Sequence, residues 1–330
     1  MSSVSAIIPT WNRADLLKSI LTNLLSQSRV PNQIVVVDNG SSDTTQLVAR
    51  EFGIDLIVFP ENRGFAAAVN EGIGRATGDW ILIVNNDVVL APEWLERLTA
   101  TAERENAAFA VGKLLRPNGQ SEIDGSWDLV SRAAYAWRCG YGKPDSAIWS
   151  TPRTIAFAPM TAALFRRDVF ERIGMLETRF ESYYEDVDFG VRCALAGVKG
   201  IYEPAAVARH LSKTTLGRGA ARVYYLTARN QIFILAKYYS RRTLIRFAWP
   251  IFAGQLLALF AAAKQRNFFA ALRGKWSGLR RWNEFENYRV STPPIIERTF
   301  RESEREIHQL QKQAGFDIYW RLYFSLVRPG

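Results

Sequence analysis

The chain has 330 residues, of which 48% are hydrophobic and 22% are charged. This composition excludes a disordered chain, and the length suffices for one large α/β domain with a second core. The two cysteines, Cys139 and Cys193, supply neither a disulfide framework nor a metal knuckle, which is typical of a reducing cytoplasm. Because Met1 leads directly into a strand-like run, we expect no signal peptide.

The net charge of +10 is unevenly distributed. Residues 1–200 contain 20 Lys and Arg against 24 Asp and Glu, whereas residues 201–330 contain 22 against 8. Between Pro204 and Asn283 there is no acidic residue, and fifteen Lys or Arg occur among aromatic and aliphatic side chains. Such a segment is typical of nucleic-acid binding or of attachment to an anionic membrane surface. The long apolar runs favour the membrane, and we expect no nucleic acid as partner.

The first 90 residues alternate between strand and helix patterns. Apolar runs predict strands over 4–9, 33–37, 54–59 and 80–84, and amphipathic or small-residue segments predict helices over 15–26, 44–51 and 65–76. This alternation predicts a doubly wound, mostly parallel sheet. Asp38, Arg63 and Asp87 follow successive strands, and the ligand of such a sheet lies beyond the carboxyl ends of its strands. We therefore expect these side chains to meet in one crevice.

The next segment predicts a helix over 94–104 and a strand over 108–115, followed by an irregular aromatic loop over 117–151. Its aromatic residues are either a stacking surface for a sugar or a packed lid: Trp127, Tyr135, Trp137 and Tyr141. Strands over 153–165 and 198–202 and helices over 167–173 and 186–196 follow. Glu203-Pro204 is then expected to form a turn, with His210 in a polar loop.

The stretch Glu181–Gly190 begins with Glu181 and then carries three crowded carboxylates, those of Glu185, Asp186 and Asp188, among aromatic residues. Acidic side chains commonly begin a helix, where the dipole favours negative charge. Crowded carboxylates also repel one another, so that one of them needs a raised pKa or a cationic partner, which suits a general base. The stretch alone leaves both readings open.

The last third predicts basic helices over 221–281, and 247–263 is their most apolar part. Seventeen residues that include Pro250 and Gln255 are marginal for a spanning helix, which needs about twenty, so we expect an interfacial or re-entrant helix. Residues 296–313 predict a charged, solvent-exposed helix. We therefore expect a catalytic domain over 1–220 and a helical, membrane-associating region over 221–330.

Taken together, the motifs resemble those of family 2 glycosyltransferases, and most closely the rhamnosyltransferase-like bacterial branch, over roughly residues 3–240. The matching segments are VSAIIPTWN (4–12), VDNGSSD (37–43), NRGF (62–65) with Asn70 and Gly72, NND (85–87), LFRR (164–167), YEDVD (184–188) and His210. The resemblance implies a GT-A fold, a nucleotide-sugar donor, a divalent cation such as Mg²⁺ or Mn²⁺, and inversion at the anomeric carbon.

By this resemblance, the donor site comprises Pro9, Thr10, Trp11, Asp38, Arg63, Asn85 and Asn86. A turn cap is the alternative role for Asp38. Asp87 would hold the cation with His210, for which a buried structural role is the alternative. Asn85 stands where the family usually has an Asp, so the site has one negative charge fewer. Arg209, Lys213 and Arg218 would steady the leaving diphosphate.

The resemblance also assigns the acidic stretch. Asp186 would be the base that takes the proton of the acceptor hydroxyl, with Glu185 binding the acceptor or orienting the loop. Asp188 is expected to cap the helix or to pair with Arg192 four residues later.

These expectations describe an inverting glycosyltransferase that uses dTDP-L-rhamnose in bacterial surface-polysaccharide synthesis. It would act on a saccharide or a polyprenyl-diphosphate-linked acceptor, as a peripheral protein on the inner face of the cell membrane. A UDP-hexose donor, a nucleotidyltransferase and a noncatalytic nucleic-acid-binding protein are the alternatives. Against a nucleotidyltransferase, the chain has no Gly-rich triphosphate loop near its N-terminus. Against a nucleic-acid-binding protein, that interpretation leaves Asp87 and the acidic stretch without a role.

Overall fold

The computed structural model describes residues 2–117, 121–211, 220–288 and 293–330. The chain forms two compact units, one of Met1–Trp127 with Gly140–Ser212 and one of Asp128–Cys139 with Lys213–Gly330. Residues 128–139, which the sequence analysis placed in the first domain, therefore cluster with the second unit.

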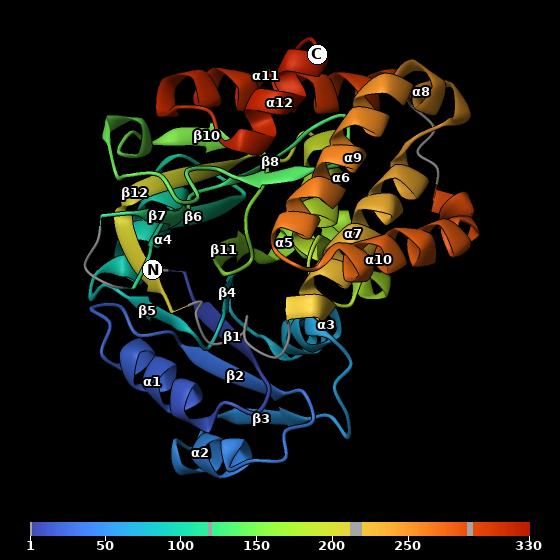
Figure 1. Ribbon diagram of the computed structural model, residues 1–330. Coiled ribbons are helices and arrows are strands. Elements are labelled where there is room, and N and C mark those ends of the chain that lie inside the picture. The colour runs from blue at the N-terminus through green and yellow to red at the C-terminus, as the bar shows by residue number, and fades with distance from the viewer. Residues whose placement is uncertain (1, 118–120, 212–219, 289–292) are drawn as a thin grey trace. The chain divides into compact units, whose positions relative to one another are not determined.

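The first unit is built on a 10-stranded sheet with the order β10-β12-β6-β11-β4-β1-β2-β3, in which β5 pairs with β12 and β7 with β6 (Figure 1). Strands β1 to β4 pair in parallel, as do β6 and β12, whereas the other five pairings of this sheet are antiparallel. The predicted α/β sheet is therefore present, but it is mixed, and its parallel part is the run β1 to β4. The strands are β1 (Val4–Thr10), β2 (Gln33–Asp38), β3 (Asp55–Val58), β4 (Trp80–Val84), β5 (Val88–Leu90), β6 (Phe109–Leu115), β7 (Ile123–Gly125), β10 (Arg153–Ile155), β11 (Ala162–Arg166) and β12 (Gly200–His210).

Helices cover both faces of this sheet because its strands are apolar on both sides. On one face, Val4, Ala6 and Ile8 of β1 join a core with α1 and α4. On the other face, a Cβ on Gly72 of α3 would lie 2.3 Å from Ile7 Cγ2, so α3 packs closely on β1. The helices of this unit are α1 (Ala14–Leu25), α2 (Thr45–Glu51), α3 (Phe65–Arg75), α4 (Trp94–Arg104), α5 (Arg167–Ile173) and α6 (Glu185–Leu195), with 3-10 helices η1 (Ala147–Trp149) and η2 (Thr178–Phe180).

An aromatic cluster fixes α6, the helix that begins in the acidic stretch. Phe189 of α6 lies edge-on to Phe165 of β11, with ring centroids 5.6 Å apart, and 5.3 Å from the ring of Phe170 in α5. Phe165 in turn contacts Phe109 of β6. Buried aromatic pairs add to the free energy of burial, so the start of α6 is held on a rigid base.

Two predicted strands differ from the structure. Residues 153–165 do not form one strand, because β10 pairs with β12 and β11 lies antiparallel between β4 and β6. The expected turn at Glu203-Pro204 lies inside β12, where the register shifts between Glu203 and Val207. A bulge tolerates a proline that cannot donate to the ladder. His210 consequently lies on a strand, paired with Val88 of β5, and not in a loop.

The aromatic segment 117–151 is also more regular than predicted. Besides β7 and η1 it contains a hairpin of β8 (Asp128–Val130) and β9 (Ala136–Arg138), and residues 118–120 lie outside the description. Trp127 is buried, with ring centroids 5.8 Å from Trp149 and 5.1 Å from Tyr202. Trp137 is buried as well, whereas Tyr141 is exposed. Trp127 and Trp137 are thus packing residues, so for these two the alternative of a packed segment holds over that of a stacking surface for a sugar.

The second unit is helical, as predicted, apart from the hairpin (Figure 1). Its elements are α7 (Ala220–Tyr238), α8 (Arg241–Arg246), α9 (Ala248–Lys264), α10 (Phe268–Arg280), η4 (Trp282–Tyr288), α11 (Pro293–Ala314) and α12 (Ile318–Leu326). The prediction of a solvent-exposed helix over 296–313 was wrong, because α11 buries Phe300, Ile307 and Glu304 on one face. The Glu304 carboxylate pairs with the buried Arg132 of the hairpin and accepts a hydrogen bond from Tyr323.

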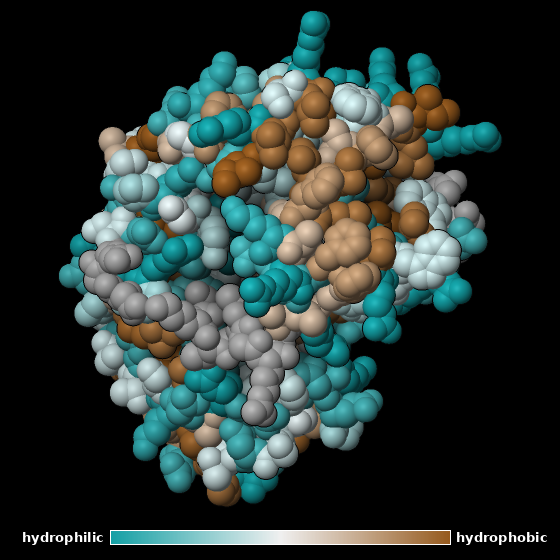
Figure 2. Space-filling model, in the orientation of Figure 1, coloured by the Kyte–Doolittle hydropathy of each residue, from teal (hydrophilic) through white to brown (hydrophobic). Residues whose placement is uncertain are grey.

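The most apolar predicted segment forms α9. Among the residues that the structure describes, no helix has the length and apolar character needed to span a membrane. Figure 2 shows hydrophobic side chains gathered over α9, and Trp249, Phe252 and Phe260 of this helix are exposed. An interfacial role for α9 stays a prediction.

Candidate active site

The carboxyl ends of β1, β2 and β4 bring the first group of predicted donor-site residues together. Thr10 and Asp38 are register partners at the ends of β1 and β2. The side-chain amide of Asn86 donates to Thr10 Oγ1 at 2.9 Å, which ties the loop after β4 to the end of β1. Thr10, Asp38 and Asn86 therefore lie together at this edge, and Asn85 is held through its backbone N–H to the Thr161 carbonyl. A crevice that also takes in Arg63 and Asp87 stays a prediction.

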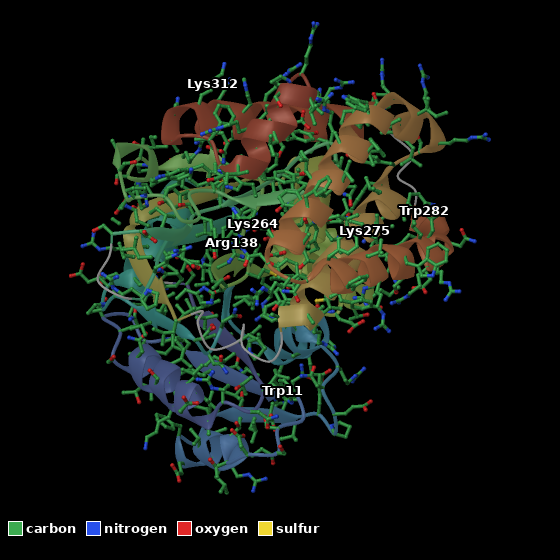
Figure 3. All side chains as sticks on the ribbon, viewed as in Figure 1. Trp11, Arg138, Lys264, Lys275, Trp282 and Lys312 are labelled. Carbon is green, nitrogen blue, oxygen red and sulfur yellow. The ribbon has the colours of Figure 1, made fainter. Side chains whose placement is uncertain are left out.

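Asp38 is fully buried and its two oxygens hold the turn into α2. The backbone N–H of Ser41 donates to Oδ1 at 3.0 Å and the Gln46 side chain to Oδ2 at 2.8 Å. The turn-cap alternative therefore describes its contacts, and its role toward the donor stays a prediction. Trp11, just beyond half-buried Pro9, is 53% exposed and remains available to a ligand (Figure 3).

Asn39 has a role that the sequence analysis missed. Its side chain is buried, accepts from the Arg63 backbone N–H at 2.8 Å and donates to the Gly64 carbonyl at 3.0 Å. It thereby fixes the loop after β3, in which the exposed Arg63 guanidinium lies 4.9 Å from the centre of the Phe59 ring. The sequence signals for Asn39 were its place beside Asp38 at the end of a predicted strand and its place in the VDNGSSD segment.

The same loop adjoins the acidic stretch. The N–H groups of Ala66 and Phe65, at the start of α3, donate to the Glu181 carbonyl at 2.9 Å and to Ser182 Oγ at 3.2 Å. A Cβ on Gly64 would lie 2.8 Å from the Glu181 carbonyl oxygen. Hydrogen bonds therefore link the donor-site loops to the turn that precedes α6, although more than a hundred residues separate them in sequence.

The turn before α6 has a strained backbone. Glu181, Tyr183 and Tyr184 have φ angles of 61°, 66° and 70°, in the left-handed region that residues other than glycine rarely adopt. Each such residue costs on the order of 1 kcal/mol and persists only where its surroundings hold it. Strain of this kind concentrates at functional sites, so it supports an active role for the stretch.

The three carboxylates of this stretch have different surroundings. Asp188 is fully buried, and Arg192 Nε donates to its Oδ2 at 3.1 Å, which confirms the predicted i,i+4 pair. Arg192 also donates to the Ile173 and Met175 carbonyls, both at 2.8 Å. Glu185 is buried, whereas Asp186 is half-buried and its Oδ1 accepts from the Val187 N–H at 2.8 Å. Asp188 is therefore a structural residue, and Asp186 is the more accessible acid at the helix start.

His210 and Asp87 lie side by side because β12 pairs with β5. His210 Nε2 lies 3.3 Å from Asp87 Oδ1, and Nδ1 lies 2.7 Å from Oδ2 of Asp124 on β7. Burial alone would lower the pKa of His210, but the hydrogen bonds with Asp124 and Asp87 outweigh it and raise the pKa to about 9. The sequence analysis missed Asp124, because only the pairing of β7 with β6 brings this isolated acid to the site.

Asp87 offers a carboxylate oxygen, and His210 would offer an imidazole nitrogen only after losing the proton that its two carboxylate neighbours favour; both atom types suit Mn²⁺. Within the described ranges, no group of three or more His, Cys, Asp and Glu side chains is arranged to hold a metal ion. The pair thus fits a cation that takes its other ligands from water and a diphosphate. Arg209 lies next to His210 and donates to the Arg116 carbonyl at 3.1 Å, whereas Lys213 and Arg218 fall outside the described residues.

Comparisons with known proteins agree with this architecture. The family model for glycosyl transferase family 2 matches residues 5–174. The O-antigen biosynthesis protein RfbC of Myxococcus xanthus is 29% identical over 208 residues, which cover 59% of this chain but only 16% of that protein. The N-acetylglucosaminyl-diphospho-decaprenol L-rhamnosyltransferase of Mycobacterium tuberculosis is 28% identical over 238 residues, which cover 64% of this chain and 77% of the relative.

Among solved structures, GalNAc-T7 with UDP, GalNAc and Mn²⁺ superposes with a TM-score of 0.64 at 13% sequence identity, covering 96% of this chain and 58% of that one. At this identity the likeness supports the fold alone, which is the predicted GT-A fold. The family match covers more than half of the chain and excludes the nucleotidyltransferase and nucleic-acid-binding alternatives. The chain is a glycosyltransferase and belongs to glycosyl transferase family 2.

Proposed function

We propose that this glycosyltransferase moves L-rhamnose from dTDP-L-rhamnose, with inversion, to a lipid-diphosphate-linked saccharide in bacterial cell-surface polysaccharide synthesis. The L-rhamnosyl group and the lipid-diphosphate acceptor follow the name of the mycobacterial relative, which is matched over 77% of its own length. The choice of dTDP as the nucleotide follows the resemblance of the sequence motifs. The acid-free helices of the second unit support a place on the inner face of the cell membrane.

The observation that carries the catalytic assignment is the Asp188–Arg192 pair. It gives the buried Asp188 a cationic partner, so that Asp186 is the half-buried acid in the first turn of α6, directly after the strained turn. In the reaction, an acceptor hydroxyl oxygen bonds to the anomeric carbon as the bond from that carbon to the diphosphate oxygen breaks. Asp186 takes the hydroxyl proton, and the electron pair of the broken bond stays on the nucleoside diphosphate. Glu185 orients the turn or the acceptor.

The donor lies at the carboxyl ends of β1, β2 and β4 in this proposal. Thr10, Asp38 and Arg63 contact its base and ribose, Pro9 and Trp11 line the pocket, and Asn85 and Asn86 face the donor. A divalent cation bound when the donor is present offsets the charge of the leaving diphosphate. Asp87 and His210 would hold it, because their side chains already adjoin.

The test of the catalytic assignment is Asp186→Asn. We expect turnover with acceptor to fall by about 10²–10⁴-fold, from the size of general-base contributions. Donor affinity, measured by titration calorimetry, should change less than about twofold, because the carboxylate acts on the acceptor. Near-normal turnover by Asp186→Asn would contradict the assignment of the base.

The donor is tested separately with a panel of dTDP-L-rhamnose, UDP-glucose, UDP-galactose and GDP-mannose. Thermal stabilisation of the wild-type chain, with and without Mn²⁺, is the measurement, and dTDP-L-rhamnose with Mn²⁺ is expected to stabilise most. Stronger stabilisation by a UDP-hexose would replace the proposed donor with the alternative one. In Asp87→Asn, stabilisation by the donor should no longer depend on Mn²⁺. If the dependence on Mn²⁺ remained, Asp87 would not be a ligand of the cation.

A further inference from the structure

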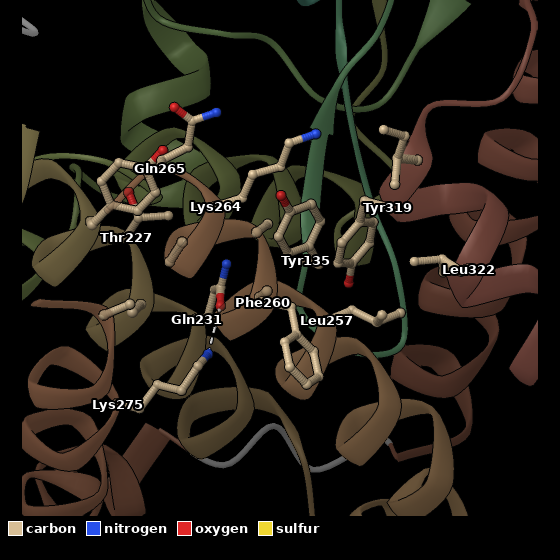
Figure 4. Close-up of a pocket in the computed structure, with 17 residues that line it drawn as sticks. Tyr135, Thr227, Gln231, Leu257, Phe260, Lys264, Gln265, Lys275, Tyr319 and Leu322 are labelled. Carbon is tan, nitrogen blue, oxygen red and sulfur yellow. Dashed lines mark hydrogen bonds between the residues drawn. The ribbon is translucent and has the colours of Figure 1, made fainter. Parts of the chain in front are cut away.

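The second unit contains a pocket of about 440 Å³ formed by α7, α9, α10, α12 and the hairpin (Figure 4). This volume lies within the range of small-molecule sites. Most of the lining is apolar or aromatic, with Leu257, Phe260 and Leu322 among its side chains, and Tyr135 stacks on Tyr319 with ring centroids 3.9 Å apart. The pocket therefore suits an amphiphilic ligand.

The charge inside this pocket has one sign. Lys264 and Lys275 line it, and none of its described lining residues is acidic. Lys275 is only 8% exposed, and its ammonium donates to Gln231 Oε1 at 3.1 Å (Figure 4). It also donates to Gln255 Oε1. Both acceptors are neutral amides, and burial lowers the pKa of Lys275 to about 7. A buried lysine without a paired carboxylate is unfavourable for folding, and an anion in the pocket would offset that penalty.

The surface around the pocket is apolar and basic. The rim residues Phe260 and Ile318 are 63% and 65% exposed, and hydrophobic side chains continue along the neighbouring helices (Figure 2). The exposed members are Trp249, Phe252 and Leu256 of α9, Phe269, Leu272 and Trp276 of α10, and Leu322 and Leu326 of α12. In sequence, α9 and α10 contain no Asp or Glu. Apolar side chains flanked by Lys and Arg are the features of a surface that lies in an anionic membrane interface.

We propose that the second unit docks on an anionic bilayer through these side chains of α9, α10 and α12, and that the pocket takes the phosphate headgroup of one anionic phospholipid. Lys275 holds the phosphate from the interior and Lys264 from the mouth. The lipid chains lie against Phe260, Ile318 and Leu322. This inference rests on the membrane attachment within the proposed function, but it is independent of donor and acceptor.

The test is co-sedimentation of the full chain with vesicles of phosphatidylcholine alone or with about 30% phosphatidylglycerol. We expect at least about tenfold tighter binding to the anionic vesicles, since each basic group near the surface contributes roughly fivefold. Lys275→Gln should lose about fivefold of this preference. The matched control is Lys312→Gln, which removes an exposed charge from α11 of the same unit and should change binding less than twofold (Figure 3).

A second arm separates the pocket from the general surface charge. Soluble dihexanoyl phosphatidylglycerol should raise the melting temperature of the wild-type chain, whereas dihexanoyl phosphatidylcholine and inorganic phosphate at the same concentration should not. Lys264→Gln replaces an exposed side chain and serves as the test variant if Lys275→Gln does not fold. It should also weaken this stabilisation. Phe260→Ser should weaken vesicle binding with either lipid composition.

Several results would overturn the inference. These are unchanged anionic preference in Lys275→Gln, equal binding to neutral vesicles, stabilisation by inorganic phosphate alone, and binding of a polyprenyl diphosphate without binding of phosphatidylglycerol. The last result would assign the pocket to the acceptor. Donor stabilisation is measured on the same samples. A chain that binds the vesicles as expected but none of the donors would refute the proposed function and leave this inference standing.

Discussion

Replacing Asp188 by Asn should destabilise the protein without acting on the chemistry directly. Asp188 is fully buried, and Arg192 would lose its carboxylate but keep the carbonyls of Ile173 and Met175. Removing one partner of a buried ion pair costs about 3–5 kcal/mol. Because Arg192 is 20% exposed and keeps those acceptors, we expect a cost at or below the lower end of that range, about 2–3 kcal/mol.

In a unit of about 200 residues, each kcal/mol shifts the melting temperature by roughly 2–4 °C, so a loss of about 4–12 °C is expected. Thermal and urea unfolding, followed by circular dichroism, measure the change. The matched control is Asp186→Asn, two residues away and half-buried, which should alter the free energy of unfolding by less than about 0.5 kcal/mol. An Asp188→Asn chain with wild-type stability and no transferase activity would refute this division of roles.

Two further predictions concern Gly64 and Lys275. Gly64 has φ 87° and ψ 166°, and an added Cβ would meet the backbone of Glu181. Gly64→Ala should therefore lower the free energy of unfolding by at least about 2 kcal/mol and lower turnover. A variant with both the wild-type melting temperature and the wild-type activity would show that the loop is not held as described. Burial lowers the pKa of Lys275 from 10.5 to about 7. Between these pH values the unfolded chain therefore binds one more proton than the folded chain. The free energy of unfolding thus rises with pH in this window, by at most about 1.4 kcal/mol per pH unit. The free energies of unfolding of wild type and Lys275→Met are measured in urea from pH 6 to 9. The value for the wild type minus the value for the variant should increase as pH rises, and a difference that is constant with pH would contradict the buried charge.

Local patterns predicted the first half of the fold closely. The strand at Trp80–Val84 and the helix at Trp94–Arg104 have the predicted bounds, because long apolar runs and strong helical periodicity specify such elements locally. The predictions failed where pairing partners decided the outcome. Strand β12 continues past Pro204 because β6 and β5 offer ladder partners on its two sides, and β11 turns antiparallel between β4 and β6.

Residue types and spacing likewise gave the chemistry of the site in part. The pairing of Asp188 with Arg192 followed from their i,i+4 spacing and was confirmed. Asn39 and Asp124 were missed, because their partners, Gly64 and His210, are 25 and 86 residues away in sequence. A side chain whose function is to hold a distant loop has no local signature.

The sequence by itself determined the alternation of strands and helices, the acid-free basic third and the carboxylates available at strand ends and at Glu185–Asp188, since these depend on composition and short-range periodicity. Only the tertiary structure decided that Asp188 is fully buried, that His210 lies between Asp87 and Asp124, and that Lys275 lies in an apolar pocket. The physical reason is that burial and pairing depend on contacts between residues far apart in the chain. The charge and reactivity of a side chain therefore follow from neighbours that its own segment does not contain.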